Sequence, residues 1–202
     1  MPPAPPFSAS SSATPAGAPV SPRLFRIVGV VAVAWYAADQ LSKAWALTAL
    51  SDGSVRPFIG ELIRLRLVLN PGAAFSLGTG STWLLTIVAV IVTAVVLRAS
   101  RRLGSLGWAW AFGMLLGGAL GNLTDRLIRP PGFGRGHVVD FLDYHVFIGN
   151  VADIAIVAAA ALIALLSLRG IHLEGVRAPD RPEATAETRE RADGDDPDGA
   201  AS

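Results

Sequence analysis

Two aspartates stand at the ends of long uncharged stretches, where a carboxylate needs a specific reason to be present. No charged residue lies between Arg102 and Asp125, and Asp153 is the only charged residue between His145 and Arg169. A charge inside a bilayer costs roughly 2.5–3.5 kcal/mol on insertion scales, so both aspartates are candidate functional groups. Two carboxylates held close together share one proton and can act as general base and general acid. This is the chemistry by which an aspartic peptidase activates water.

Helix capping and ion transport are two other interpretations of the same aspartates. A carboxylate is favourable near a helix N-terminus, where we expect Asp153, but not at a C-terminus, where we expect Asp125. Arg126, next to Asp125, supplies a compensating charge. The spacing alone therefore leaves catalysis, capping of the helix ends and an ion or proton relay as alternatives.

Asp39 and Lys43 form a second charged pair within an apolar stretch. They are four residues apart, so they share one face of a helix and can neutralise each other within the membrane. Lys43 is the only lysine among 17 basic residues, which indicates a site that needs a compact ammonium rather than a planar guanidinium. The pair either only stabilises its helix or contacts the carboxylate pair or the substrate directly.

A metal site is the rival interpretation of four polar residues in the segment after Asp125. The four are His137, Asp140, Asp143 and His145. They show no helical HxxxH spacing, and the segment begins with the turn-forming Pro130-Pro131-Gly132, so we expect neither a metal nor an organic cofactor. Asp140 is instead expected to anchor this outer loop, or to cap a short amphipathic stretch at the membrane interface.

The chain as a whole has the composition of a membrane protein with two polar ends. It has 202 residues, no cysteine, 17 basic against 16 acidic residues and a net charge of +1, and its mean hydropathy is +0.47. Residues 1–22 are rich in Pro, Ala and Ser, and residues 170–202 hold 9 of the 16 acidic residues, so both are expected to be disordered tails. The near-balance of charge argues against nucleic-acid binding. The missing cysteines exclude disulfides, cysteine metal sites and a cysteine nucleophile.

Residues 23–169 remain as the expected membrane domain, which is long enough for four spans of about 20 residues each. The apolar stretches are residues 24–50, 82–97, 103–124 and 145–169. A cleaved signal peptide competes for the first stretch, but such a segment would not normally contain an Asp and a Lys. Weak alternation over residues 55–69 predicts strands. The predicted fold is an all-α membrane protein with four transmembrane helices, a small extracytoplasmic β-rich cradle and a short outer-loop helix.

Arginines near the ends of the predicted helices indicate the orientation in the membrane. With the N-terminus in the cytoplasm, the inner segments hold eight of these arginines and the outer segments hold six. The short Arg98–Arg102 connection contributes most to this bias. Both termini are therefore expected in the cytoplasm, with Asp125 and Asp153 at the outer face of the membrane.

A row of glycines precedes Asp125 on the third predicted helix. Gly113, Gly117 and Gly121 recur every four residues, and Asp125 continues the row. Small residues let another helix approach closely. The glycine face is thus expected to pack against a neighbouring helix and to bring Asp125 against it.

Five short blocks occur in order across residues 39–156. They are Asp39-Gln40-Leu41-Ser42-Lys43, Asn70-Pro71-Gly72-Ala73-Ala74-Phe75-Ser76, Gly118-Ala119-Leu120-Gly121-Asn122-Leu123-Thr124-Asp125-Arg126, Val138-Val139-Asp140-Phe141 and Asn150-Val151-Ala152-Asp153-Ile154-Ala155-Ile156. Each block alone is a weak signal. Together the sequence resembles the bacterial lipoprotein signal peptidase (signal peptidase II) family, four-helix aspartic peptidases of the inner membrane.

The resemblance implies an intramembrane aspartic endopeptidase with Asp125 and Asp153 as its catalytic dyad. Its substrates would be prolipoproteins whose signal peptide is cut just before a diacylglyceryl-modified cysteine. Membrane lipids would surround an enzyme that we expect to be a monomer, with no nucleic acid and no cofactor. Further residues would shape the site, bind substrate or support it: Asn70, Gly72, Asn122, Arg126, Asn150 and Ala152, with Asp39, Lys43 and Asp140 as supporting residues.

One departure from the family pattern lies directly before the last block. The family usually has Phe before the Asn of that block, whereas Ile148-Gly149 separates Phe147 from Asn150 here. We expect a small insertion that alters the approach to the fourth helix. A small membrane transporter that uses the carboxylates as an ion relay, and a non-enzymatic membrane scaffold, are the alternative classes.

Overall fold

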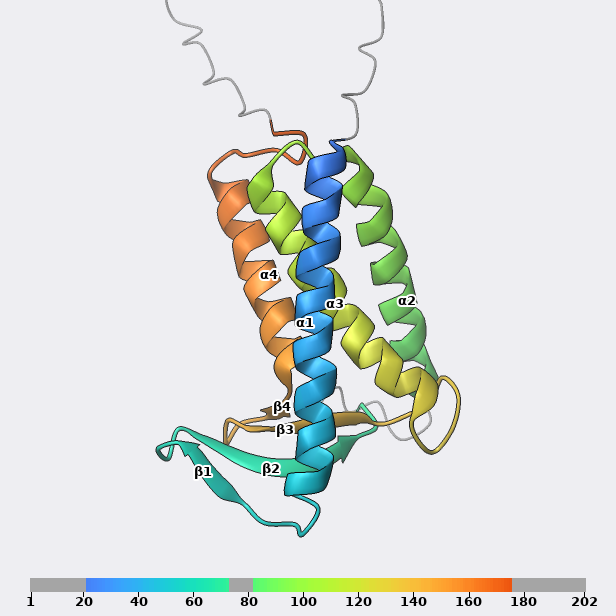
Figure 1. Cartoon of the computed structure of the whole chain (residues 1–202), viewed down its shortest axis with the longest axis vertical. Coiled ribbons are helices and arrows are strands. Elements are labelled where there is room, and N and C mark those ends of the chain that lie inside the picture. The colour runs from blue at the N-terminus through green and yellow to red at the C-terminus, as the bar shows by residue number, and fades with distance from the viewer. Residues whose placement is uncertain (1–20, 73–81, 176–202) are drawn as a thin grey trace, which may run out of the picture.

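Four helices form a bundle in the computed structural model, which describes residues 21–72 and 82–175 (Figure 1). They are α1 (Pro22–Ala49), α2 (Thr82–Ala99), α3 (Leu106–Ile128) and α4 (Val151–Leu168), and a 3-10 turn η2 (Ser100–Arg102) follows α2. Within the described residues, these four helices are long and apolar enough to cross a membrane. The prediction of four spans is therefore confirmed. Most of the two predicted tails, residues 1–22 and 170–202, lies outside the described residues.

A small sheet covers one end of the bundle, opposite the end where α1 begins and α4 finishes (Figure 1). Its strands are β1 (Arg56–Ile59), β2 (Ile63–Asn70), β3 (Val138–Asp143) and β4 (Ile148–Gly149). They are ordered β1-β2-β3-β4, and each neighbouring pair is antiparallel. The alternation over residues 55–69 thus correctly predicted strands, and β1 and β2 form a hairpin there.

The predicted short outer-loop helix is wrong. Among the described residues between α3 and α4, the structure has turns and the strands β3 and β4 instead. β3 lies between β2 and β4, so its backbone groups find partners on both sides, and every residue of Val138–Asp143 is buried. Val138, Val139 and Phe141 are residue types that favour strands, and pairing with β2 and β4 satisfies the backbone of this segment.

The helix α3 lies at the centre of the bundle and packs mainly against α1 and α4. Three of its glycines, Gly113, Gly117 and Gly121, face α1. A Cβ added at Gly117 would lie 2.7 Å from the carbonyl oxygen of Ala32, and one added at Gly121 would collide with the carboxylate of Asp39. The predicted close approach of another helix to the row of Gly113, Gly117 and Gly121 is confirmed. This approach brings the charged residues of α1 against α3.

The described residues that follow α4 pack over the connection between α2 and α3. The indole Nε1 of Trp108 donates to the carbonyl oxygen of Ile171 at 2.9 Å. The backbone N–H of Gly104 donates to the carbonyl oxygen of Leu173 at 3.0 Å. The first residues beyond α4 are therefore bound to the end of the bundle that lies opposite the sheet.

We expect Gly117→Ala to destabilise the bundle by about 1–3 kcal/mol, because the new methyl group would meet the backbone of α1. Gly29→Ala is the matched control, since it lies on α1 and a Cβ there would meet nothing within 4 Å. Thermal unfolding in detergent, followed by tryptophan fluorescence, compares the two. Equal melting temperatures would contradict the close α1–α3 contact.

Candidate active site

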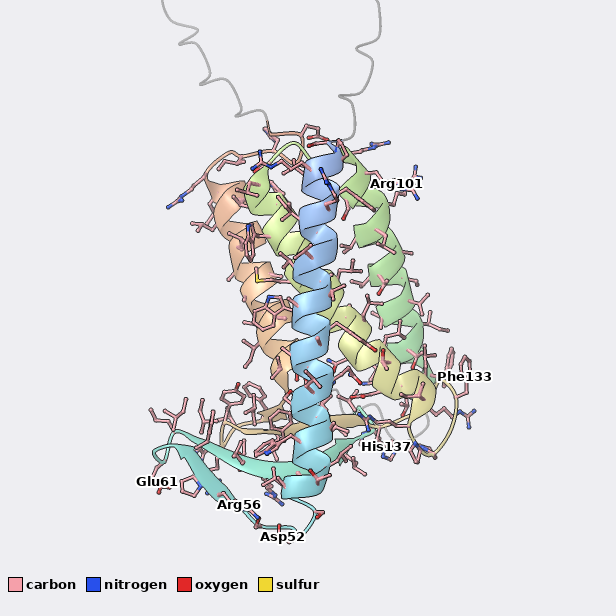
Figure 2. All side chains as sticks on the ribbon, in the orientation of Figure 1. Asp52, Arg56, Glu61, Arg101, Phe133 and His137 are labelled. Atoms are coloured by element: carbon pink, nitrogen blue, oxygen red, sulfur yellow. The ribbon has the colours of Figure 1, made fainter. Side chains whose placement is uncertain are left out.

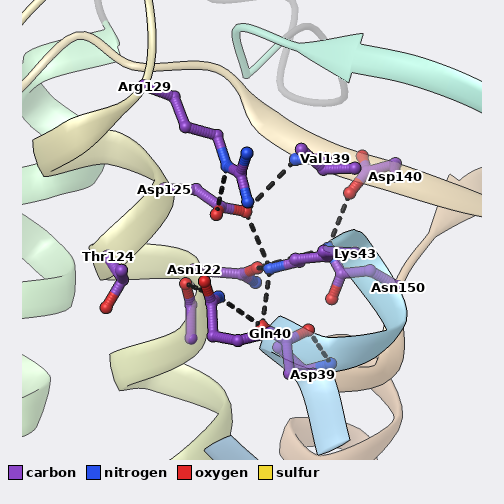
Figure 3. A network of polar contacts seen from close by, with 12 residues as sticks. Asp39, Gln40, Lys43, Asn122, Thr124, Asp125, Arg129, Val139, Asp140 and Asn150 are labelled. Atoms are coloured by element: carbon purple, nitrogen blue, oxygen red, sulfur yellow. Dashed lines mark hydrogen bonds and ion pairs between the residues drawn. The ribbon is translucent and has the colours of Figure 1, made fainter. Parts of the chain in front are cut away.

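The predicted site residues gather where the sheet meets the bundle (Figure 3). Three helices and two strands contribute to this cluster: α1, α3, the first turn of α4, β2 and β3. Segments far apart in the sequence are therefore joined by polar side chains at one end of the membrane-spanning helices.

The ammonium of Lys43 is the centre of the network. The residue is fully buried, and its Nζ contacts Asp39 Oδ2 at 2.8 Å, Asp125 Oδ2 at 2.8 Å and Asn122 Oδ1 at 2.9 Å. An ammonium has three protons, so each proton has one acceptor. Lys43 therefore forms an ion pair within α1, with Asp39, and also contacts Asp125 of α3 directly.

Asp125 is fully buried, and both of its oxygens are occupied by protein donors. Arg129 Nε donates to Oδ1 at 2.6 Å, and the backbone N–H of Val139 donates to Oδ2 at 3.2 Å, beside the contact with Lys43. α3 continues to Ile128, so Asp125 lies in its last turn, where Arg129 supplies the positive charge that a helix C-terminus favours. Arg129 is not among the site residues predicted from the sequence, although it lies four residues after Asp125.

Asp39 connects α1 to the beginning of α4. Its Oδ1 accepts from the backbone N–H of Ala152 at 2.9 Å, and its Oδ2 accepts from Gln40 Nε2 at 3.0 Å in addition to Lys43. A carboxylate at the N-terminus of a helix satisfies a free N–H group and interacts favourably with the helix dipole. Ala152, predicted to shape the site, does so through its backbone.

Asp153 and Asn150 cap α4 reciprocally. The side chain of Asn150 accepts from the backbone N–H of Asp153 at 3.1 Å, and Asp153 Oδ2 accepts from the backbone N–H of Asn150 at 3.0 Å. The other oxygen, Oδ1, accepts from Asn122 Nδ2 at 3.1 Å. Asp153 therefore does cap the helix, as the capping interpretation expected. Its half-buried carboxylate is also hydrogen-bonded to Asn122 and so belongs to the polar cluster.

Asp140 extends the cluster into the sheet. It is 2% exposed and accepts from Asn150 Nδ2 at 2.6 Å and from Asn70 Nδ2 at 2.7 Å. Burial is the largest influence on this carboxyl group and raises its pKa to about 6; the two amide hydrogen bonds oppose the rise, and the charge of Asp153 adds to it. The register that pairs Val68 with Asp140 brings Asn70 within reach.

A cavity of about 560 Å³ opens beside these residues. Its polar lining comes from Asn70, Asn122, Arg126, Asp140 and Asp153, and its apolar lining comes mainly from α2, α3 and α4. Gly72 also lines it and donates its N–H to Asn70 Oδ1 at 2.7 Å. Asp153 and Asp140 thus face one cavity, whereas Asp125 is not among the described residues that line it.

Arg126 brings a cation to the same cavity. It is 9% exposed, and its buried Nη1 has no hydrogen-bond partner among the described residues. An unsatisfied buried donor of this kind is costly. A carbonyl oxygen entering the cavity would therefore find a donor available at Arg126.

The departure at Ile148-Gly149 forms the short strand β4. Gly149 pairs with Leu142 of β3, and a Cβ added to it would lie 2.9 Å from Asp153 Oδ2. Phe147 and Ile148 line the cavity. The chain therefore reaches α4 through a strand that runs directly beside Asp153.

The side chains of the rival metal site bond to other groups and do not converge on one point, although the backbone N–H of His145 donates to Asp143 Oδ1 at 2.8 Å. Asp143 Oδ2 pairs with Arg64 at 3.1 Å, and His145 Nε2 contacts the carbonyl oxygen of Glu61 at 2.6 Å. Across residues 21–72 and 82–175, no three His, Asp or Glu side chains gather in a way that could hold a metal ion. Asp140 is directed to Asn70 and Asn150 instead.

Comparisons with known proteins identify the family of the chain. The signal peptidase (SPase) II family matches residues 31–169. A lipoprotein signal peptidase of Leifsonia xyli subsp. xyli is 46% identical over 175 residues, covering 86% of this chain and 81% of that protein. One from Rhodococcus jostii is 48% identical over 157 residues, covering 76% of each.

A solved structure described as a bacterial membrane enzyme, obtained by the in meso method, has a similar fold. It superimposes with a TM-score of 0.62 at 26% identity, covering 70% of this chain and 92% of that one. The matched family, the relatives and the four apolar helices identify a multi-pass bacterial membrane protein. The chain therefore belongs to the signal peptidase II family, peptidases that remove signal peptides from prolipoproteins.

Proposed function

We propose that the chain is an aspartic endopeptidase that cuts a prolipoprotein just before its diacylglyceryl-modified cysteine, with Asp140 and Asp153 as the pair that activates water. The observation that carries the proposal is that both carboxylates line one cavity of about 560 Å³. Asn150 links them, since its side-chain amide donates to Asp140 while its backbone N–H donates to Asp153. The apolar walls of the cavity suit a lipidated peptide within the membrane.

The pairing of Asp125 with Asp153, expected from the sequence, is the second candidate. The contacts of Asp125 argue against it, because Lys43 and Arg129 hold both of its oxygens in ion pairs. A carboxylate with both oxygens held by buried protein donors has little room to bind a water molecule. Asp140 and Asp153 instead accept from amide groups, which orient a carboxylate without neutralising its charge.

The reaction then needs one proton shared by the pair. The ionised carboxylate takes a proton from water as the water oxygen attacks the scissile carbonyl carbon, and the protonated carboxyl group donates to the leaving nitrogen as the C–N bond breaks. Arg126 Nη1, which has no partner among the described residues, would donate to the developing oxyanion. Asn70, Gly72 and Asn122 shape the same cavity.

The orientation in the membrane is part of the proposal. Arginines at the end of the bundle away from the sheet, on α1, α2 and η2, favour a cytoplasmic location for that end. The sheet and the cavity would then lie at the outer face, where the lipid of a prolipoprotein sits in the leaflet. Residues 23–169 would form the peptidase unit, acting as a monomer.

Replacing each aspartate in turn distinguishes the two pairings. We expect Asp140→Asn and Asp153→Asn to abolish cleavage of a lipidated prolipoprotein by the purified protein, with losses of at least about 10³-fold, because each removes a proton-transfer group. Asp125→Asn should instead lower thermal stability, by about 3–5 kcal/mol, since it leaves Lys43 without one of its buried partners.

The folded fraction of the Asp125→Asn protein should still cleave. Cleavage retained in a folded Asp140→Asn protein, together with its loss in Asp125→Asn, would return the assignment to Asp125. Cleavage retained in all three folded variants would contradict both pairings, because none of these carboxylates would then be needed for the reaction. Tryptophan fluorescence in detergent checks that each variant is folded.

The raised pKa of Asp140 predicts a pH dependence of stability. An aspartate in an unfolded chain has a pKa of about 3.9, and in the native protein the pKa of Asp140 is about 6. Between these values the native state binds more protons, so the free energy of unfolding should fall as pH rises from about 4 to 6. Thermal unfolding at several pH values should show a weaker decline in Asp140→Asn than in the unaltered protein.

Asp52→Asn is the control for the pH experiment. Its carboxylate is exposed in the turn between α1 and β1. Hydrogen bonds from Ser54, followed by the nearby Arg56, lower its pKa, the opposite direction to Asp140. The decline between about pH 4 and 6 should therefore persist in this variant. A decline that is the same in Asp140→Asn as in the unaltered protein would contradict the raised pKa.

The proposed orientation is testable because the chain has no cysteine. Asp52→Cys places a single thiol in the exposed turn between α1 and β1, and Arg101→Cys places one at the opposite end of the bundle (Figure 2). In intact cells without an outer membrane, a membrane-impermeant maleimide should label the first and not the second. The reverse pattern would place the cavity on the cytoplasmic side.

A further inference from the structure

The loop of residues 129–137, which we call the α3–β3 loop, carries an apolar side chain away from the protein. Phe133 is 85% exposed, and Ile128, at the end of α3, is 72% exposed. Figure 2 shows Phe133 beside the end of α2 that is nearer the sheet, on the outside of the bundle. The described part of the chain does not cover either of these apolar side chains, so their burial requires contact with another molecule.

The α3–β3 loop is held in a definite shape. Backbone hydrogen bonds of 3.0 Å close it on itself and on α3: Arg135 N–H to Gly132 O, His137 N–H to Pro130 O and Gly136 N–H to Arg126 O. A Cβ added at Gly136 would collide with the carbonyl oxygen of Asp125, so the loop and the helix are packed backbone to backbone there. Phe133 therefore lies in a turn whose backbone is fixed by hydrogen bonds and by packing against α3.

The loop also reaches past the first residue of α2. Thr86 Oγ1 donates to the carbonyl oxygen of Gly134 at 2.7 Å. Thr86 comes four residues after Thr82, where α2 begins, which corresponds to about 6 Å along a helix axis. Interfacial segments bury apolar side chains about 5–10 Å into the boundary between headgroups and acyl chains. Phe133 thus lies at the level of the first turn of a helix that is apolar enough to span.

The charges of the loop complete this arrangement. Arg129 is neutralised by Asp125, at 2.6 Å. Arg135 is exposed and forms no ion pair within residues 21–72 and 82–175. An aromatic ring beside a free arginine at the end of a spanning helix matches an anionic phospholipid surface, where the ring enters the interface and the cation meets phosphate.

We propose that the α3–β3 loop is a membrane-interface anchor: Phe133 and Ile128 enter the boundary between headgroups and acyl chains, and Arg135 binds lipid phosphate. The loop is bonded to the last turn of α3 through Gly136 and Arg129. The anchor therefore fixes the depth in the bilayer of the helix end that carries Arg126. This proposal needs only a chain that spans a membrane, and it holds for either assignment of the catalytic aspartates.

A spin label measures the depth directly, because Phe133→Cys would be the only thiol in the chain. The labelled full chain is placed in vesicles of phosphatidylcholine and phosphatidylglycerol, and power saturation compares collisions with oxygen and with a water-soluble nickel chelate. We expect the label at position 133 to favour oxygen several-fold more than a label at Asp52→Cys. Asp52 lies in the exposed turn between α1 and β1, beyond the end of α1 (Figure 2).

Two results would overturn the anchor. A label at position 133 that meets the nickel chelate as readily as the one at position 52 would place the loop in water. A label shielded from both reagents would place Phe133 against protein. Arg135→Gln tests the phosphate contact separately: removing phosphatidylglycerol from the vesicles should make the label at position 133 shallower only when Arg135 is present, and an equal response in both proteins would remove the phosphate contact.

Discussion

The rest of the site depends on the contacts that the buried ammonium of Lys43 makes with its three acceptors. A lysine that has lost all contact with water is tolerated only when every proton is donated, and Asp39, Asp125 and Asn122 supply the three acceptors within 2.9 Å. Because Asp39 also binds the first turn of α4, through Ala152, this one charge sets α1, α3 and α4 in a single register. The glycines of α3 allow the close approach that these short contacts require.

Four buried or half-buried aspartates in one cluster divide into two kinds by their partners. Asp39 and Asp125 are paired with cations, Lys43 for both and Arg129 for the second. Asp140 and Asp153 accept from asparagine amides and the backbone, and they face the cavity. Environment rather than residue type assigns the roles, as in enzymes where neighbouring carboxylates differ in pKa. The first pair supports the architecture, and the second pair is our proposed catalytic pair.

Our proposed pair differs from the pair that membrane cost favours. Asp125 ends one apolar stretch and Asp153 lies within another, whereas Asp140 lies in a strand and has no such signal. The cost of burying Asp125 is met by Lys43 and Arg129, so its burial does not by itself require a catalytic role. A buried charge can thus mark an ion pair as readily as a reactive group.

The sequence by itself determined the four spans, the strands over residues 55–69, the Asp39–Lys43 pair and the glycine face of α3, because each depends on spacing within one segment. Only the tertiary structure decided that residues after α3 form strands, that Asn70 meets Asp140 and that Asp140 joins Asp153 at the cavity. The reason is physical: these contacts join residues far apart in the chain, and pairing between strands and burial, not local periodicity, select them.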